Sequence, residues 1–286
     1  MKYIKYFFQF LIIILFFFIF KLIGPKISSK IGGRLFEKIG PLFRSKKLIH
    51  NNIEKAFPEI DLKEKNNITK MMWNNYGRVF AEYIFIKNFK NENLNSNIEI
   101  KGQEILEEIK KNNKSVIFIS GHFANFELMA MHIEKSGINL AAIYRPLNNI
   151  FLNKIMERIR SKYICKYQIK KGKGGLKKLL GLKKKNFSTA LMIDQRVSEG
   201  IQSKFFNEKA LTTTIPAQLV KKFNIPVIPI YIERIKDINF LLTINKPIHF
   251  EQNNSIENIT NILNQTIEKM VLKNPGQWIW SHNRWK

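Results

Sequence analysis

The sequence predicts an α/β fold, in which a single domain with a central, largely parallel mixed sheet flanked by helices follows an N-terminal transmembrane or interfacial helix. Short apolar runs of strand length alternate with helical patterns from the centre of the chain to its end. One helical pattern joins two of these runs, as in a parallel strand pair. A long apolar run near the N-terminus predicts the membrane helix.

Length and composition limit the class of protein. The chain has 286 residues, of which 45% are hydrophobic, so it can bury a substantial core and is not a disordered chain. Lys and Arg exceed Asp and Glu by 48 to 22, a net charge of +26. This excess predicts an anionic partner, which by composition alone is nucleic acid, a membrane surface or a phosphorylated substrate. The single Cys165 excludes an internal disulfide.

The apolar run predicts a membrane anchor over residues 1–24. From Tyr6 to Phe20 the only polar side chain is Gln9, and a spanning helix needs about 17–25 residues. The following Gly24-Pro25-Lys26 does not match a signal-peptide cleavage site, so we expect the anchor to be retained. Flanking lysines favour a cytoplasmic body. An interfacial helix is the alternative, although the run is apolar all round and has no polar face.

The remaining elements follow in order. Residues 25–50 are a basic segment with short amphipathic pieces, and 64–87 have helical periodicity. At the centre, strand Ser115–Ser120 leads into a helix that Asn125 caps and that ends near Gly137. Further strands are expected at Leu140–Tyr144, Ser188–Ile193, Val227–Ile232 and Phe240–Ile244. Further helices are expected near 150–162, 174–185, 215–223 and 255–272.

The segment GHFANFE, residues 121–127, contains the candidate chemistry. His122 and Glu127 are five apart and do not share a helix face. They can meet if His122 lies on the turn after the strand and Glu127 lies in the first turn of the next helix. Glu127 would then fix the imidazole tautomer, and the free nitrogen would take a proton from a hydroxyl. On the pattern alone, a solvated histidine and a glutamate favourable at a helix start are the more ordinary explanation.

Several blocks in chain order resemble the late acyltransferases of bacterial lipid A biosynthesis, the lauroyl/myristoyl transferase family, within the His-x4-Asp/Glu glycerolipid acyltransferase superfamily. GHFANFE is similar to the family's GHFGNWE-like block, with Ala124 and Phe126 as departures. Three further stretches are similar to family blocks: YRPLN at 144–148, DQ at 194–195 with FF at 205–206, and the tail PGQWIWSHNRWK. Asn207 stands where the family has Gly, and Asn tolerates a left-handed conformation. The resemblance covers nearly the whole chain.

The resemblance implies that residues 25–286 form an acyltransferase catalytic domain. His122 would be the general base and Glu127 its partner. Arg145 and Asp194 match positions in or near the family's active site, where an arginine holds an anionic group or stabilises an oxyanion. An ordinary ion pair between Arg145 and Asp194 is the alternative.

The resemblance also implies the substrates and the location. The donor would be acyl-acyl carrier protein, and the acceptor a hydroxyl of a phosphorylated, Kdo-bearing lipid A precursor at the cytoplasmic side of the bacterial inner membrane. A lysophospholipid or aminolipid acceptor is the nearest alternative. A basic nucleic-acid-binding protein is a different class, but no nucleic-acid-binding motif supports it. We expect neither cofactor nor metal, because no residue cluster has metal-ligand spacing.

Other charged and aromatic residues have ordinary interpretations. Arg78 and Glu82 are one helical turn apart and are expected to pair. His132 is expected to be packed or at the surface, and His282 belongs to a Trp-rich tail that docks on the domain or the membrane. The Lys-rich region 162–185 contains no acid, so it is either a solvated face or an attachment site for anionic lipid, phosphate or an acidic carrier protein.

Overall fold

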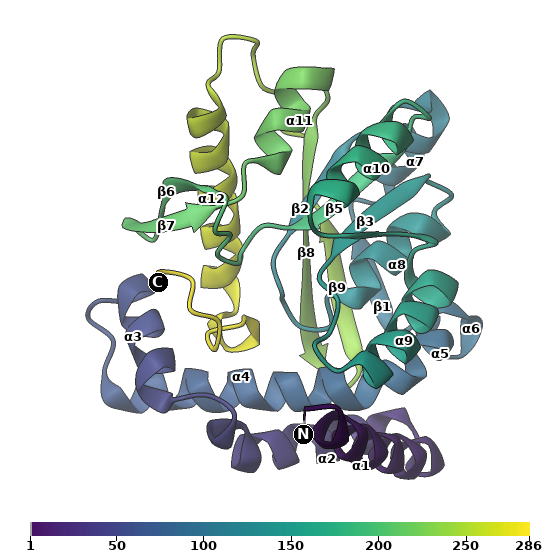
Figure 1. The fold of residues 1–286 in the computed structure, drawn as a ribbon, viewed down its shortest axis with the longest axis vertical. Coiled ribbons are helices and arrows are strands. Elements are labelled where there is room, and N and C mark those ends of the chain that lie inside the picture. The colour runs from purple at the N-terminus through teal and green to yellow at the C-terminus, as the bar shows by residue number, and fades with distance from the viewer. Residues whose placement is uncertain (1) are drawn as a thin grey trace.

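The structure, a computed structural model, describes residues 2–286 and has a seven-stranded sheet at its centre (Figure 1). The strand order is β1-β9-β8-β2-β5-β3-β4. The bounds are β1 Ile98–Lys101, β2 Ile117–Ser120, β3 Leu140–Tyr144, β4 Tyr167–Lys170, β5 Ser188–Met192, β8 Val227–Lys236 and β9 Asn239–Ile244. Neighbouring strands are parallel except for the antiparallel pair β8 and β9, so the predicted mixed sheet is confirmed.

The sheet is larger than the sequence predicts. The five predicted strands are present, but β1 and β4 were not anticipated. These two form the edges of the sheet, and each is only four residues long with charged or amide side chains among the apolar ones. Half-exposed edge strands of this kind lack the continuous apolar run that identifies a strand buried on both faces.

Helices surround the sheet. Their bounds are α1 Lys2–Ile23, α2 Pro25–Ile39, α3 Lys46–Ala56, α4 Leu62–Glu82, α5 Ile86–Lys90, α6 Glu92–Asn95, α7 Gln103–Asn112, α8 Glu127–Lys135, α9 Ile150–Ile159, α10 Lys173–Lys183, α11 Ile215–Phe223 and α12 Ile256–Lys273. Short helical turns are η1 Gly40–Leu42, η2 Tyr83–Phe85, η3 Arg160–Ile164 (a π-helix) and η4 Pro275–Gln277. Right-handed crossovers in this strand order place α7 and α8 on one face of the sheet and α10 and α11 on the other.

The N-terminal helices lie along one end of the molecule, with α1 and α2 beside the long helix α4 (Figure 1). By length and composition, α1 is apolar enough to cross a membrane. Helix α2 is continuous where only short pieces were expected. It crosses α4 at Gly32 and Gly77, and a Cβ on Gly77 would lie 2.0 Å from the carbonyl oxygen of Gly32. Glycine at this crossing therefore allows the two backbones to touch.

The C-terminal part adds a hairpin and a buried tail. Strands β6 (Ile201–Phe205) and β7 (Glu208–Thr212) pair antiparallel beside α12. Phe206 and Asn207 form the turn with φ of 52° and 60°, so the expected left-handed conformation of Asn207 is confirmed. The tail after α12 packs back onto the body, where Trp280 and Arg284 are fully buried. The expected docking of this Trp-rich segment is therefore confirmed, with the domain as its partner.

Two local predictions were wrong. Helix α8 begins at Glu127, and the side chain of Asn125 does not cap it but donates to Glu82. Glu82 is fully buried and pairs with Arg234, not with Arg78. Arg78 instead binds Asn74 and Ser29. An (i, i+4) spacing permits a pair, but a buried carboxylate takes the partners that the fold brings to it.

Candidate active site

The sheet brings the predicted site residues to one edge. Strands β2 and β5 are parallel neighbours, with Ser120 opposite Met192. His122 and Asp194 each follow two residues later, so they leave the sheet side by side. Strand β3 ends at Tyr144 on the other side of β5, which brings Arg145 to the same edge. Ligands of open α/β sheets usually bind at this carboxyl edge.

His122 is bound to Asp194 in two ways. Its ring Nδ1 lies 2.9 Å from Oδ1 of Asp194, and its backbone N–H donates to Oδ2 at 2.8 Å. The indole N–H of Trp278 donates to the same Oδ2 at 2.9 Å. The ring also packs edge-on against Phe126, with centroids 4.8 Å apart. These contacts fix the imidazole in one orientation.

The charge of Asp194 determines the tautomer of His122. Burial opposes ionisation of this carboxyl, but the charge of His122 and the hydrogen bonds from His122 and Trp278 outweigh burial. Its pKa therefore lies below the ordinary value. An ionised carboxylate only accepts hydrogen bonds, so Nδ1 of His122 carries the proton. When the ring is neutral, the lone pair therefore lies on Nε2, where it can accept a proton.

Glu127 does not take the position expected for it. Its carboxylate binds the guanidinium of Arg160, with Nε 2.9 Å and 3.2 Å from the two oxygens and a further contact from a terminal nitrogen. The expected contact between Glu127 and the His122 ring is therefore wrong, because Asp194 binds that ring. Glu127 begins α8, and its buried side chain faces the π-helical turn η3 that contains Arg160.

Arg145 lies on the rim of the site. Its side chain is exposed and lines the same pocket as His122. Asp194 is bound by His122 and Trp278, so the alternative ion pair between Arg145 and Asp194 is wrong. The carboxylate of Asp194 is fully buried and contacts the ring of His122.

The loop between β2 and α8 is held in an unusual conformation. Ala124 has φ of 40°, a left-handed conformation that costs about 1–2 kcal/mol in a residue with a Cβ. Its N–H donates to the carbonyl of Gln277 at 3.1 Å, and Asn75 donates to its carbonyl. The next residue, Asn125, is tied to Glu82 at 3.0 Å. Contacts from α4 and the tail therefore hold the turn that presents His122.

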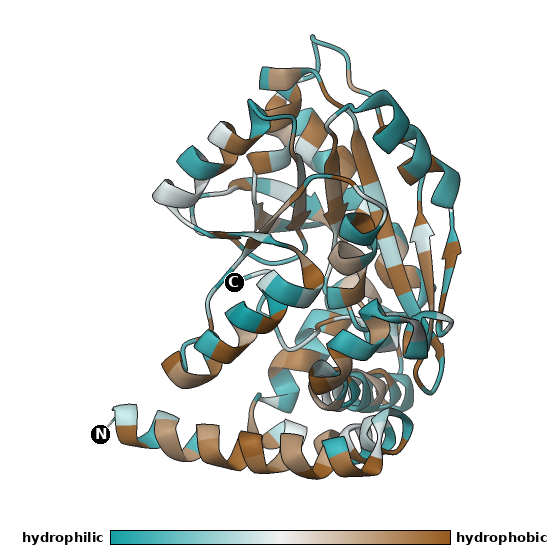
Figure 2. Cartoon of the chain, turned by 90° about the vertical axis from the view of Figure 1, so that its right-hand side faces the viewer, coloured by the Kyte–Doolittle hydropathy of each residue, from teal (hydrophilic) through white to brown (hydrophobic). Residues whose placement is uncertain are grey.

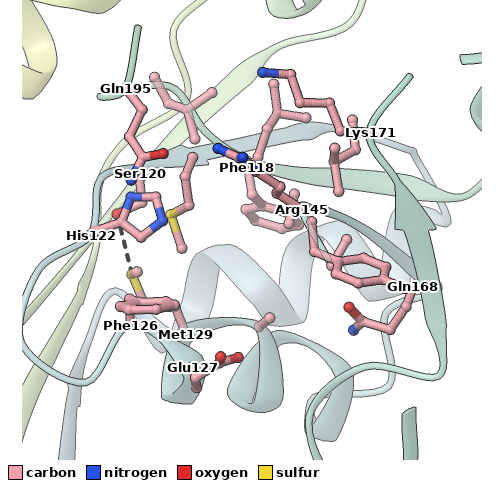
Figure 3. Close-up of a pocket in the computed structure, with 18 of the residues that line it drawn as sticks. Phe118, Ser120, His122, Phe126, Glu127, Met129, Arg145, Gln168, Lys171 and Gln195 are labelled. Carbon is pink, nitrogen blue, oxygen red and sulfur yellow. Dashed lines mark hydrogen bonds between the residues drawn. The ribbon is translucent and has the colours of Figure 1, made fainter. Parts of the chain in front are cut away.

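The site opens into a pocket of about 480 Å³. In Figure 3, His122 and Gln195 lie at one end, Gln168 and Lys171 lie at the other, and Phe118 and Arg145 lie between them. The apolar lining residues include Phe118, Met129, Ile133, Ile143, Ile164 and Ile230. The pocket thus combines a histidine base with a largely hydrocarbon interior, which suits a substrate with an apolar chain.

A second histidine lines the pocket beside His122. Nε2 of His282 accepts a hydrogen bond from the backbone N–H of Arg196 at 3.0 Å. Burial lowers the pKa of His282 to about 4, partly offset by the charge of Asp194. His282 is therefore neutral at neutral pH. It connects the tail to the loop after β5, next to the candidate base.

The Lys-rich region is not uniformly solvated. Lys183 is buried with its ammonium 2.5 Å from the hydroxyl of Ser115, and burial lowers its pKa to about 8. Lys170 pairs with Glu157 of α9 at 3.1 Å, and Lys171 lines the pocket. Exposed lysines remain on α10 and after it: Lys177, Lys178, Lys184 and Lys185.

Arg160 and Trp278 were missed as site residues. Arg160 lies among several basic residues, and nothing in their pattern distinguishes it. Trp278 belongs to the tail block that carries the resemblance, and this membership was the available signal; its contact with Asp194 is visible only in the structure. His132, expected to be packed or at the surface, is buried with Nε2 3.0 Å from Gln103.

The comparison with a family profile and the comparison with known sequences agree. The sequence profile described as bacterial lipid A biosynthesis acyltransferase matches residues 1–286. Lipid A biosynthesis acyltransferase 2 of Shigella flexneri is 27% identical over 63% of this chain and 58% of its own length, which is less than two thirds of that relative. The lipid A biosynthesis myristoyltransferase of Escherichia coli (strain K12) is 22% identical over 87% of this chain and 76% of its own. The lipid A biosynthesis lauroyltransferase of the same strain is 23% identical over 85% of this chain and 79% of its own length.

The crystal structure of the 1-acyl-sn-glycerophosphate acyltransferase from Thermotoga maritima gives a TM-score of 0.42 and 12% identity, over 90% of this chain and 100% of that one.

Proposed function

Because the chain belongs to the bacterial lipid A biosynthesis acyltransferase family, we propose that it transfers a fatty acyl chain from acyl-acyl carrier protein to a hydroxyl of a Kdo-bearing lipid A precursor. One observation carries the proposal: a histidine whose Nε2 has no hydrogen-bond partner among the residues that the structure describes lies at the end of a largely apolar pocket. The pocket suits the acyl chain, and the histidine suits activation of the acceptor hydroxyl. The reaction so proposed uses neither a metal nor a cofactor.

His122 acts as the general base. Its Nε2 accepts the proton of the acceptor hydroxyl while that oxygen attacks the thioester carbonyl, giving a tetrahedral oxyanion. The intermediate collapses with cleavage of the carbon–sulfur bond, and the imidazolium returns the proton to the leaving thiolate. The products are the ester and the free thiol of the carrier. Asp194 stabilises the imidazolium throughout, because it is ionised and hydrogen-bonded to Nδ1.

Arginines complement the negative charge of the reaction. Arg145 on the rim holds an anionic part of the substrate or the oxyanion. Glu127 acts through Arg160, which it holds by a bidentate contact. Both residues line the pocket, so this pair sets the position of a positive charge beside the acyl group. The proposed catalytic residues His122 and Glu127 thus act through two separate contacts, the hydrogen bond of His122 to Asp194 and the ion pair of Glu127 with Arg160.

The acceptor is identified most directly from lipids. The protein would be expressed in a Gram-negative strain that lacks its own late acyltransferase, and lipid A would be analysed by mass spectrometry. The expected result is lipid A heavier by one ester-linked acyl group, with a His122→Ala variant giving no addition. An unchanged lipid A together with newly acylated lysophospholipid or aminolipid would overturn the proposed acceptor.

The acyl carrier protein is proposed as donor because it is acidic, whereas the surface around α10 is basic. Exposed Lys177 and Lys178 lie on this helix. Their replacement by Glu should raise KM for acyl-acyl carrier protein at low salt and leave kcat nearly unchanged. The difference should shrink at high salt, where screening removes the attraction. Reversal of two exposed lysines elsewhere, Lys63 and Lys209, is the matched control. Equal effects of both pairs would contradict carrier binding at α10.

The proposed location is the bacterial inner membrane, with the catalytic domain of residues 25–286 facing the cytoplasm. Acyl carrier protein is a soluble donor, and the lipid acceptor resides in the membrane, so the enzyme must work at the boundary between them. The basic N-terminal region supports attraction to an anionic leaflet.

A further inference from the structure

Helix α1 is attached to the body along most of its length. Near its start, the side chain of Asn149 donates to the carbonyl of Tyr6 at 2.8 Å, and Phe151 packs against Phe10 at 5.8 Å between centroids. Near its end, Phe17 packs on Phe80 of α4 at 5.1 Å, and Phe20 is fully buried. The attached stretch, residues 6–20, covers about 21 Å of helix.

The other faces of α1 are exposed and apolar. Its most exposed large side chains include Ile4, Phe8, Ile12, Leu15, Phe18 and Leu22, each at least 56% accessible. Exposed Ile27 and Ile31 of α2 and Leu42 and Phe43 at η1 extend the apolar surface along the chain. Figure 2 shows the helix that begins at the N label as a mostly hydrophobic rod along one edge of the molecule.

Basic residues surround this surface. Residues 1–50 contain ten Lys and Arg and one acid, Glu37. Exposed members of this set include Lys21, Lys26, Lys30, Arg34 and Lys38. An apolar surface with a cationic border complements an anionic bilayer, since acyl chains receive the apolar part and headgroups the charges.

A crossing orientation of α1 conflicts with its attachment. If α1 spanned the bilayer, the flank from Asn149 to Phe80 would enter the hydrocarbon with it. Exposed Arg145 and Lys154 lie close to Asn149 in sequence on that flank. A charged side chain at the bilayer centre is strongly unfavourable. A spanning α1 would have to leave the body and expose Phe17 and Phe20.

We propose that α1 lies in the plane of an anionic bilayer as an interfacial helix and does not cross it. A helix that is apolar all round fits this position, because one face is buried in the protein and the others are buried in acyl chains. The polar face that an isolated interfacial helix needs is replaced here by the body itself.

This orientation also places the pocket at the membrane. Asn149 caps α9 directly after the rim residues Arg145–Asn148, so its bond to Tyr6 ties the rim to the interfacial helix. A lipid acceptor would then reach His122 from the leaflet without leaving it. Only this consequence rests on the proposed function; the orientation of α1 is tested without any activity measurement.

Depth measurement separates the two orientations. Single cysteines at Ile4, Leu11 and Phe18 lie seven residues apart on one exposed face. Spin labels at these positions would be measured in vesicles of phosphatidylglycerol and phosphatidylethanolamine, using paramagnetic relaxation by oxygen and by a water-soluble nickel complex. The proposal predicts the same depth, within a few ångströms, for all three. Unequal depths would overturn the proposal. In a spanning helix either the label at position 11 is the deepest, or each label lies about 10 Å deeper than the one before it.

Sidedness gives an independent result. In sealed vesicles with the body outside, Lys2→Cys at the polar start of α1 should react with an impermeant maleimide added outside, as should Lys209→Cys on β7. Wild type should not react, because Cys165 is fully buried and burial raises its pKa to about 12. Reaction of Lys2→Cys only after permeabilisation would show a spanning helix. The spin labels on α1 could also be equally shielded from water when no vesicles are present. That result would show that another copy of the chain covers the surface, and it would also overturn the proposal.

Discussion

Nδ1 of His122 lies 2.9 Å from Oδ1 of Asp194, although 72 residues separate them in the sequence. The contact exists because β2 and β5 are neighbours and end in register. It defines which ring nitrogen of His122 is basic, and most of the predictions below derive from it or from the loop that carries the histidine.

Replacing the carboxylate should impair the base and not the binding of substrate. In Asp194→Asn, the amide no longer holds Nδ1–H or stabilises the imidazolium, so kcat should fall by about 10²–10⁴-fold. KM should change little, since Asp194 is buried beneath the histidine. Steady-state kinetics with circular dichroism as the folding control measures this. A folded Asp194→Asn enzyme with near-normal kcat would contradict the role of Asp194.

Glu127 and Arg160 should behave as one unit. Removing the charge of either partner leaves the other as a nearly buried, uncompensated ion, which costs about 3–5 kcal/mol in comparable pairs. Glu127→Gln and Arg160→Gln should therefore each lower the urea midpoint strongly. The double variant should be less destabilised than the sum of the two, because neither charge remains alone. Strict additivity would show that the pair is not coupled in solution.

Glycine at position 124 should stabilise the protein. Ala124 adopts a left-handed conformation, and glycine removes the clash of its Cβ, for an expected gain of about 1 kcal/mol in the free energy of unfolding. The matched control is Ala130→Gly within α8, which should lose about 1 kcal/mol. Thermal unfolding of both variants measures the difference. Destabilisation by Ala124→Gly would mean that the loop does not have this conformation.

The position of His122 was predictable, but its hydrogen-bond partner was not. Strand β2 is a short, fully buried apolar run, so its end and the turn with His122 were visible in the sequence. The His-x4-Glu spacing and the family resemblance both predict Glu127 as its partner. The true contact depends on β5 lying between β2 and β3, an order that neither periodicity nor composition encodes. The link between Tyr6 and Asn149 was invisible for the same reason, since it is a product of tertiary packing.

Acid should destabilise the protein through its buried histidines. Burial lowers the pKa of His132 to about 4, with a smaller contribution from Lys135, while the unfolded chain keeps the ordinary value near 6.5. The unfolded state alone therefore gains a proton as pH falls from about 6.5 to about 4, and the free energy of unfolding decreases in that window. His132→Gln should weaken this pH dependence of the urea midpoint by up to one proton. A slope identical to wild type would show that His132 is not buried as a neutral ring.

The most direct test of the central claim is single-turnover transfer from acyl-acyl carrier protein to a Kdo-bearing lipid A precursor by wild type and His122→Asn, at saturating acceptor. We predict that the variant remains folded, binds the acceptor with similar affinity and transfers the acyl group about 10²–10⁴-fold more slowly. Transfer by folded His122→Asn at a rate close to wild type would contradict general-base catalysis by His122.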